Sequence, residues 1–144
     1  MIEKDVILFI RGEQYHDGVD PNDTELTTEG TMTIADNGEI TLSYQETELT
    51  GMAGTTTQFV VNGDTVTLNR LGNVKSQMIF QLGRQHSSMY NTPYGALRVD
   101  INTSTLRHRI NEHGGVMEIQ YSIAVEHQVT GRNQFKIRVR EKMR

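Results

Sequence analysis

Apolar and polar residues alternate over most of this chain, with a repeat of two residues. The repeat is clearest at Met117, Ile119, Tyr121, Ile123 and Val125. Such alternation over about four to eight residues is typical of a β-strand with one buried face, because successive side chains point to opposite faces of a sheet. The same repeat occurs in the segments 40–44, 59–61, 66–68, 78–82, 97–101 and 135–139. The chain therefore predicts strands along most of its length.

Turn-forming residues separate these segments. The strongest hairpin signals are Asn37-Gly38 and Asn62-Gly63, because a type I′ turn needs a positive φ at both central residues. No segment has the pattern of a helix. We expect eight to ten strands, joined by short connections into an antiparallel meander that forms a barrel or a sandwich. The length of 144 residues predicts a single domain, 1–144.

Composition supports an all-β class. Of the 144 residues, 39 are Thr, Val or Ile, whereas only four are Ala and nine are Leu. The absence of Cys excludes disulfides and thiolate metal sites. The longest apolar run, Val6 to Ile10, is too short for a transmembrane helix, and the first residues lack the features of a signal peptide. These observations predict a soluble, cytoplasmic protein with no membrane association.

The inward positions change parity within the segment 97–110. Val99 and Ile101 are odd-numbered, whereas Leu106, His108 and Ile110 are even-numbered. An extra residue in one strand shifts every later side chain to the other face. We therefore predict a β-bulge or a bend near residues 102–104.

Several polar residues occupy inward positions. In the predicted strand 39–50, Glu46 and Glu48 follow Tyr44 on one face, and Arg70 follows Leu68 on the next strand but one. A buried charge needs a partner, so Glu46 and Arg70 are expected to meet each other or water. Two interpretations stay open: an ion pair that fills one end of a barrel, or a lumen whose Arg70 and tyrosines face an anionic ligand.

Catalytic and metal motifs are not found. The five histidines form no HxH or HExxH pattern, and Ser87-Ser88 lacks the surroundings of a nucleophile elbow. Glu46 and Glu48 resemble a glycosidase carboxylate pair in spacing, but the chain has no Trp to line a sugar cleft. The sequence predicts no metal, no cofactor and no catalytic residue, and it favours a protein that is not an enzyme.

Charge is distributed unevenly. Residues 1–66 carry 2 basic and 13 acidic side chains, and residues 67–144 carry 12 basic and 5 acidic ones. The last strand presents a basic stripe opposite its apolar face, consisting of Lys136, Arg138, Arg140 and Lys142. The stripe indicates either an anionic partner or cross-strand pairing with Glu118 and Glu126. No aromatic side chains alternate with it, which disfavours a single-stranded nucleic acid.

Five short motifs occur in order along the chain. They are Thr28-Glu29-Gly30, Tyr44-Gln45-Glu46-Thr47, the segment 50–55, Leu68-Asn69-Arg70-Leu71-Gly72 and the segment Tyr90-Asn91-Thr92-Pro93-Tyr94-Gly95. Together they resemble the YwiB-like family of small bacterial proteins, from Val6 to Val139. The resemblance implies a calycin-type, lipocalin-like β-barrel and brings no established activity.

Two hypotheses follow from these patterns. In the first, the barrel binds a small, anionic or amphipathic ligand in its lumen through Tyr44, Glu46, Arg70, Tyr90, Thr92 and Tyr94. In the second, the chain is an interaction module that docks an acidic protein or RNA through Lys136, Arg138, Arg140 and Lys142. A monomer and a homodimer are both compatible with the sequence.

Overall fold

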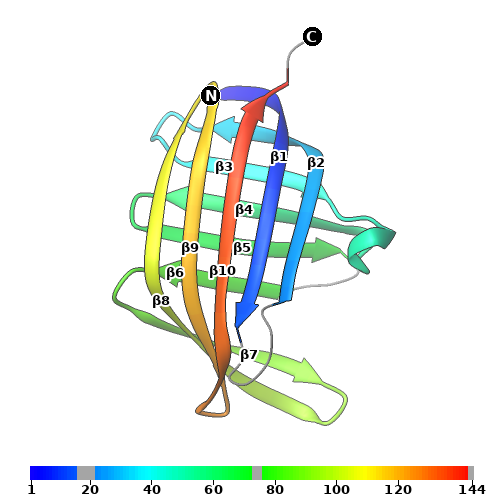
Figure 1. The fold of residues 1–144 in the computed structure, drawn as a ribbon, viewed down its shortest axis with the longest axis vertical. Helices are drawn as coiled ribbons and strands as arrows, with labels where there is room; N and C mark the ends of the chain where they lie inside the picture. The colour runs from blue at the N-terminus through cyan, green and yellow to red at the C-terminus, as the bar shows by residue number, and fades with distance from the viewer. Residues whose placement is uncertain (16–21, 73–75, 143–144) are drawn as a thin grey trace.

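The computed structural model describes residues 1–15, 22–72 and 76–142, and only the backbone of Asn22 and of residues 90–92. Its described part is built from β-strands and one short 3₁₀ helix (Figure 1). The strands are β1 (Ile2–Tyr15), β2 (Asn22–Ile34), β3 (Ile40–Gln45), β4 (Thr55–Asn62), β5 (Thr65–Gly72), β6 (Ser76–Gln81), β7 (Gln85–Thr92), β8 (Gly95–Asn111), β9 (Gly114–Val125) and β10 (Gln128–Glu141).

The ten strands form one antiparallel sheet that curls into a nearly closed meander barrel. Their order is β6-β5-β4-β3-β2-β1-β10-β9-β8-β7, so β1 and β10 pair and the sheet ends at β6 and β7. Two single bridges lie near these ends: Gln81 of β6 pairs with Arg84, just before β7, and Leu82, just after β6, pairs with Thr103 of β8. Figure 1 shows two layers: β8, β9, β10, β1 and β2 run side by side, and β3 to β6 cross behind them. No described strand or helix covers the outer face of this front layer (Figure 1).

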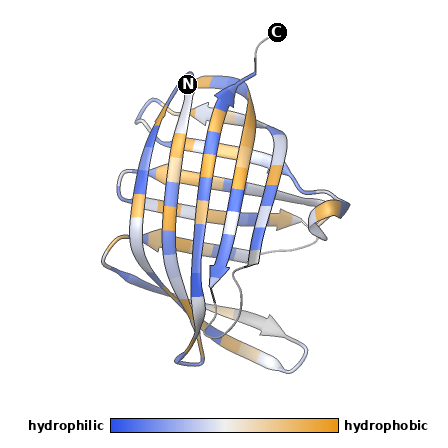
Figure 2. Cartoon of the chain, in the orientation of Figure 1, coloured by the Kyte–Doolittle hydropathy of each residue, from blue (hydrophilic) through white to orange (hydrophobic). Residues whose placement is uncertain are grey.

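Alternating side chains fill the barrel interior, as the repeat of two predicts. Figure 2 shows hydrophobic and hydrophilic residues alternating along the front strands. Leu8, Leu42, Leu68 and Ile119 are completely buried in one continuous core. Burial of each such side chain contributes about 1.5–3 kcal/mol to folding. The core therefore accounts for why the barrel closes with these faces inward.

A β-bulge interrupts β8 where the sequence predicts it. The pairing of β8 with β9 shifts register between Thr103 and Thr105. Beyond the bulge, Leu106 packs against the core, and the ring of His108 contacts the carbonyl oxygen of Gly63 at 2.6 Å. That contact links β8 to the turn between β4 and β5, across the barrel.

The hairpin turns differ in detail from the prediction. Turns do follow β2 and β4 at the Asn-Gly pairs, but only the glycines, Gly38 and Gly63, have a positive φ. The turn with two positive φ values is Glu126-His127, at 50° and 69°, between β9 and β10. Tertiary pairing of two long strands imposes this conformation on residues that do not favour it.

The strand predicted over 39–50 is shorter than expected. β3 ends at Gln45, and a 3₁₀ helix, η1 (Glu48–Thr50), follows it. Thr47 caps this helix, since its side chain accepts a hydrogen bond from the amide of Leu49, and Gly51 ends it in the left-handed region. Glu48 therefore does not share a strand face with Glu46, and the predicted carboxylate pair is wrong.

Candidate functional site

An inward-facing polar group lies at one end of the barrel, on three neighbouring strands. Tyr44 on β3 is the register partner of Thr57 on β4, and Thr57 is the partner of Arg70 on β5. Glu46 follows Tyr44 by two residues and lies just after the end of β3. Tyr44 and Glu46 are each 6% exposed, and Thr57 is completely buried. The structure thus places Tyr44, Glu46 and Arg70 at the same end of the barrel.

Hydroxyl groups, and not Arg70, hold the buried carboxylate. Glu46 accepts hydrogen bonds from Thr50 Oγ1 at 2.7 Å and from Thr57 Oγ1 at 3.0 Å. In the described part of the chain no ion pair joins Glu46 to Arg70. The Nε atom of Arg70 is buried without a hydrogen-bond partner. The sequence interpretation of a Glu46–Arg70 ion pair plugging the barrel is therefore not what the structure contains.

Tyr44 belongs to the same hydrogen-bonded group. Burial raises the pKa of its hydroxyl well above the ordinary value of 10.0, and the nearby, hydrogen-bonded Glu46 raises it further. Gly30 on β2 lets β3 approach closely beside Tyr44, because a Cβ there would lie 2.5 Å from the carbonyl oxygen of Ser43 and 3.4 Å from the Cβ of Tyr44. Tyr44 is thus a neutral hydrogen-bond donor at any physiological pH.

The tyrosine-rich segment lies on a hairpin formed by β7 and β8. Tyr94 is in the turn of this hairpin and is 99% exposed, so the structure does not place it in the lumen. Figure 1 shows the hairpin extending away from the barrel. A side chain at the tip of a projecting hairpin is turned towards water, which the sequence pattern alone does not reveal. The side chains of Tyr90 and Thr92 lie outside the described residues.

A buried carboxylate that sequence patterns miss is Asp100, which is 3% exposed. Its Oδ1 accepts hydrogen bonds from Ser87 Oγ at 2.6 Å and from Arg98 Nε at 2.9 Å. These bonds hold the pKa of Asp100 below its ordinary value. His127 approaches the other carboxylate oxygen at 3.8 Å, but no hydrogen bond joins it to Ser87. The cluster ties β7 and β8 to the β9–β10 turn and lacks the order of a Ser-His-Asp triad.

A second candidate lies on the outer face of the front layer, and we name it the basic face. It consists of Arg107 and Arg109 on β8 and of Lys136, Arg138 and Arg140 on β10, all exposed. β9 lies between these strands, which places the two columns of cations about 9.6 Å apart. Within each column the charges are about 6.8 Å apart. Three of the four residues of the stripe predicted from the last strand thus belong to this face.

The basic face borders a groove of about 720 Å³. Phe9 on β1 and Val116 on β9 contribute apolar contacts to it, and Val116 is 55% exposed. The guanidinium carbons of Arg138 and Arg140 lie 4.5 and 5.5 Å from the centre of the Phe9 ring. Such cation–π contacts orient the arginines while leaving their charge at the surface.

The cations of the basic face have acidic neighbours but are not ion-paired with them. None of the five forms an ion pair with another residue of the described chain. Glu118 is the register partner of both Arg107 and Lys136, but its carboxylate accepts hydrogen bonds from Gln120 and Gln134. Glu126 accepts a hydrogen bond from the backbone amide of Arg98. The alternative of cross-strand pairing therefore does not account for these five charges.

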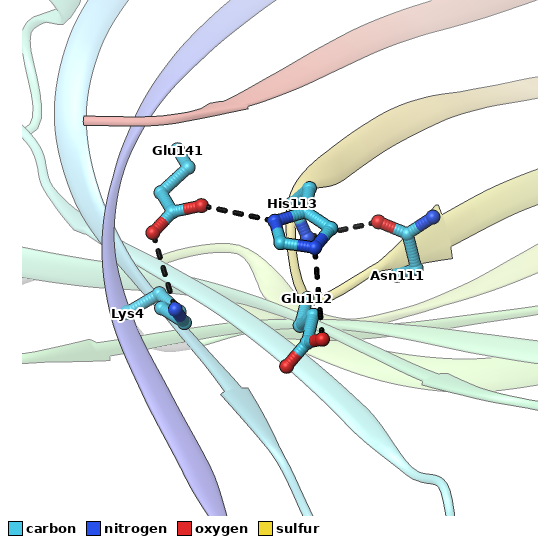
Figure 3. A network of polar contacts seen from close by, with 5 residues as sticks. All are labelled: Lys4, Asn111, Glu112, His113 and Glu141. Carbon is cyan, nitrogen blue, oxygen red and sulfur yellow. Dashed lines mark hydrogen bonds and ion pairs between the residues drawn. The ribbon is translucent and has the colours of Figure 1, made fainter. Parts of the chain in front are cut away.

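Lys142, the last residue of the predicted stripe, behaves differently. Its Nζ atom donates to Glu29 of β2 at 2.9 Å. Beside it, Glu141 accepts from Lys4 at 3.1 Å and contacts His113 Nδ1 at 3.3 Å, and His113 also contacts Glu112 (Figure 3). The hydrogen bond from Lys4, followed by that from His113, holds the pKa of Glu141 below its ordinary value. This end of the barrel is therefore a paired network and not a free basic surface.

Other features of the described residues are less specific. A pocket of about 410 Å³ lies near the bulge, between neutral polar side chains such as Asn102, Gln120 and Gln134. No three His, Asp or Glu side chains gather into a possible metal site in the part of the chain that the structure covers. Among those same residues, no helix has the length and apolar character needed to cross a membrane.

The fold defines the chain as a small meander β-barrel. The chain belongs to the family described as a domain of unknown function (DUF1934), whose model matches residues 9–137. The fold is also that of the crystal structure of the YwiB protein from Bacillus subtilis, with a TM-score of 0.83 and 21% sequence identity over 98% of this chain and 94% of the other. No match was found among curated proteins. The resemblance seen in the sequence motifs is thereby confirmed, and it carries no assigned activity.

Proposed function

We propose that this protein is an interaction module whose basic face binds an acidic protein surface. The observation that carries the proposal is a set of five exposed cations that form no ion pair with any described residue, arranged in two columns beside a groove of about 720 Å³. Five like charges on one face repel one another, so a partner that supplies carboxylates lowers this cost. The exposed Val116 and the half-buried Phe9 add apolar contact at the centre of the face.

A protein suits this face better than a nucleic acid does. Glu118 lies between Arg107 and Lys136 and would repel a phosphate chain that passed between the two columns. Phe9 is the aromatic residue of the groove, and two guanidinium groups already cover its ring, so it offers no platform for a base. A folded protein presents separate carboxylates and apolar side chains. It can also place one of its own cations opposite Glu118.

The test compares an acidic peptide with an RNA of similar charge. Polyglutamate and single-stranded polyuridylate are titrated into the protein over a series of salt concentrations. The double variant Arg138→Gln/Arg140→Gln removes two charges of the basic face, and Arg84→Gln/Arg132→Gln removes two exposed charges elsewhere. We expect polyglutamate to bind in low salt, the first variant to lose most of that affinity, and the second to keep it. Equal loss in both variants would contradict the proposal, and preferential binding of RNA would replace the protein partner with a nucleic acid.

A second candidate function is the binding of a small anion at the barrel end. It is favoured by one observation, the buried Nε of Arg70 without a hydrogen-bond partner. A carboxylate or phosphate oxygen would satisfy this donor, and Tyr44 would supply a neutral hydroxyl beside it. Native mass spectrometry of the protein from its own host tests this candidate: extra mass that Arg70→Met abolishes would support it, and bare protein in both cases would not.

A further inference from the structure

We infer that the acidic surface that meets the β10 side of the basic face is supplied by a second copy of this chain. The inference rests on the proposed function and names its partner. It comes from the order of three neighbouring strands on the outer face, β10, β1 and β2. In the rows that contain residues 7 to 11 of β1, their outward side chains form a basic column, a mainly apolar column and an acidic column.

The register places these three columns in matched rows. One row runs from Arg140 through Ile7 to Glu29. The next runs from Arg138 through Phe9 to Thr27, and a third runs from Lys136 through Arg11 to Glu25. In the first and third rows, a cation and a carboxylate therefore lie on opposite sides of β1, about 4.8 Å from it on each side.

A two-fold axis parallel to the strands, above β1, makes this face complementary to itself. Such an axis exchanges left and right but keeps each row at its own height along the strands. It places β10 of one copy over β2 of the other, twice. Arg140 then meets Glu29 of the other copy, and Lys136 meets Glu25. An axis perpendicular to the strands would instead superimpose β10 on β10, with cations facing cations. The charges thus select one isologous arrangement.

The middle column is compatible with this arrangement. Ile7 and Phe9 would meet their own copies at the axis, which supplies apolar contact where the charged columns do not reach. Arg11 would also meet itself, but Glu13 and Asp23 already neutralise it, at 3.0 and 3.4 Å. The charge of Arg11 at the axis is therefore compensated within each copy.

The acidic column is available for such contacts. Glu25 is exposed and has no ion pair among the described residues, and Glu29 has only the exposed pair with Lys142. An exposed pair contributes little to stability, so exchanging it for an intermolecular pair costs little. Three columns on one face form a small interface, and we expect the dimer to be weak and sensitive to salt.

The test uses three charge variants of the full chain in sedimentation velocity experiments over a wide concentration range. Lys136→Glu/Arg140→Glu places carboxylates on both sides of β1 in the first and third rows, and Glu25→Lys/Glu29→Lys places cations on both sides. The variant that combines all four substitutions exchanges the charges within these two rows and keeps the net charge of the wild type. We expect the wild type and the fourfold variant to dimerise in low salt, and each double variant to remain a monomer.

Each outcome is decisive. Circular dichroism confirms that every variant is folded before its association is measured. A wild type that dimerises while the fourfold variant stays monomeric would overturn the two-fold arrangement, as would double variants that dimerise normally. If the wild type stays monomeric at every concentration but binds polyglutamate, the inference of a second copy as partner is wrong and the proposed function stands. A wild type that neither dimerises nor binds polyglutamate would refute both.

Discussion

Arg138 on β10 and Phe9 on β1 are register partners, and the guanidinium carbon lies 4.5 Å from the centre of the phenyl ring. This contact fixes a charged side chain in the wall of the groove. Its contribution at a half-exposed site is about 0.5–1 kcal/mol. The side chain of Arg138 is therefore held in place before any partner binds.

Replacing Phe9 by Leu removes the aromatic ring and keeps apolar volume. We expect Phe9→Leu to lower the free energy of unfolding by about 0.5–1 kcal/mol through loss of the cation–π contact. Urea denaturation measures this change. In a double-mutant cycle with Arg138→Gln, the two losses are expected to be less than additive, and strict additivity would show that the contact contributes nothing.

Gly30 is required for packing rather than for its backbone conformation. A Cβ at this position would lie 2.5 Å from the backbone oxygen of Ser43 and 3.0 Å from Leu8 Cδ1. We expect Gly30→Ala to reduce the free energy of unfolding by about 1–3 kcal/mol, measured by urea denaturation. Gly12→Ala is the matched control: its Cβ would meet the side-chain hydroxyl of Thr24 at 2.9 Å, which can rotate away. An equal effect in both variants would contradict the steric account.

Thr57 supplies one of the two hydroxyl groups that bind the buried Glu46 carboxylate. Thr57→Val has nearly the same shape and removes this donor, so we expect a loss of about 1–3 kcal/mol in the free energy of unfolding. Thr56→Val is the control on the other face of β4, where the hydroxyl contacts Gln45 at an exposed site. Its effect should stay within about 0.5 kcal/mol. A tolerated Thr57→Val would mean that Arg70 or water holds Glu46.

Glu141 makes a pH-dependent contribution to stability. Its pKa in the folded protein lies below the ordinary value of 4.5, because Lys4 and then His113 bind the charged form. A carboxylate with a lowered pKa stabilises the fold above its unfolded pKa, and this contribution is lost as the pH falls through the folded pKa. We expect Glu141→Gln to destabilise the protein near neutral pH and to match the wild type in acid. Urea denaturation at several pH values, repeated in a Lys4→Met background, measures this difference.

Much of the fold could be predicted from the sequence, because burial of one strand face imposes a repeat of two. The parity change between Ile101 and Leu106 even located the bulge at Thr103 and Thr105. The end of β3 could not be predicted, because Glu46 and Glu48 keep the alternation while Thr47 and Gly51 provide the caps of η1. The same holds for the turn at Glu126-His127, whose positive φ values result from strand pairing.

The candidate sites were predictable only in part. The row of Tyr44, Thr57 and Arg70 depends on strand register, and the sequence placed two of its three members on inward positions. Residues far apart in the chain, such as Phe9 and Arg138, cannot be paired without knowing that β1 lies beside β10. The buried Asp100 was missed because it occupies an outward position that Ser87 and Arg98 cover.

The most direct test of the central claim is to map the binding of polyglutamate by NMR. The isotope-labelled protein is titrated in low salt, and amide shifts are followed residue by residue. We predict shifts at Phe9, Val116 and Arg138, with little change at Tyr44, Thr57 and Arg70. Shifts confined to Tyr44, Thr57 and Arg70 would contradict the outer basic face as the binding site and would place binding in the barrel end.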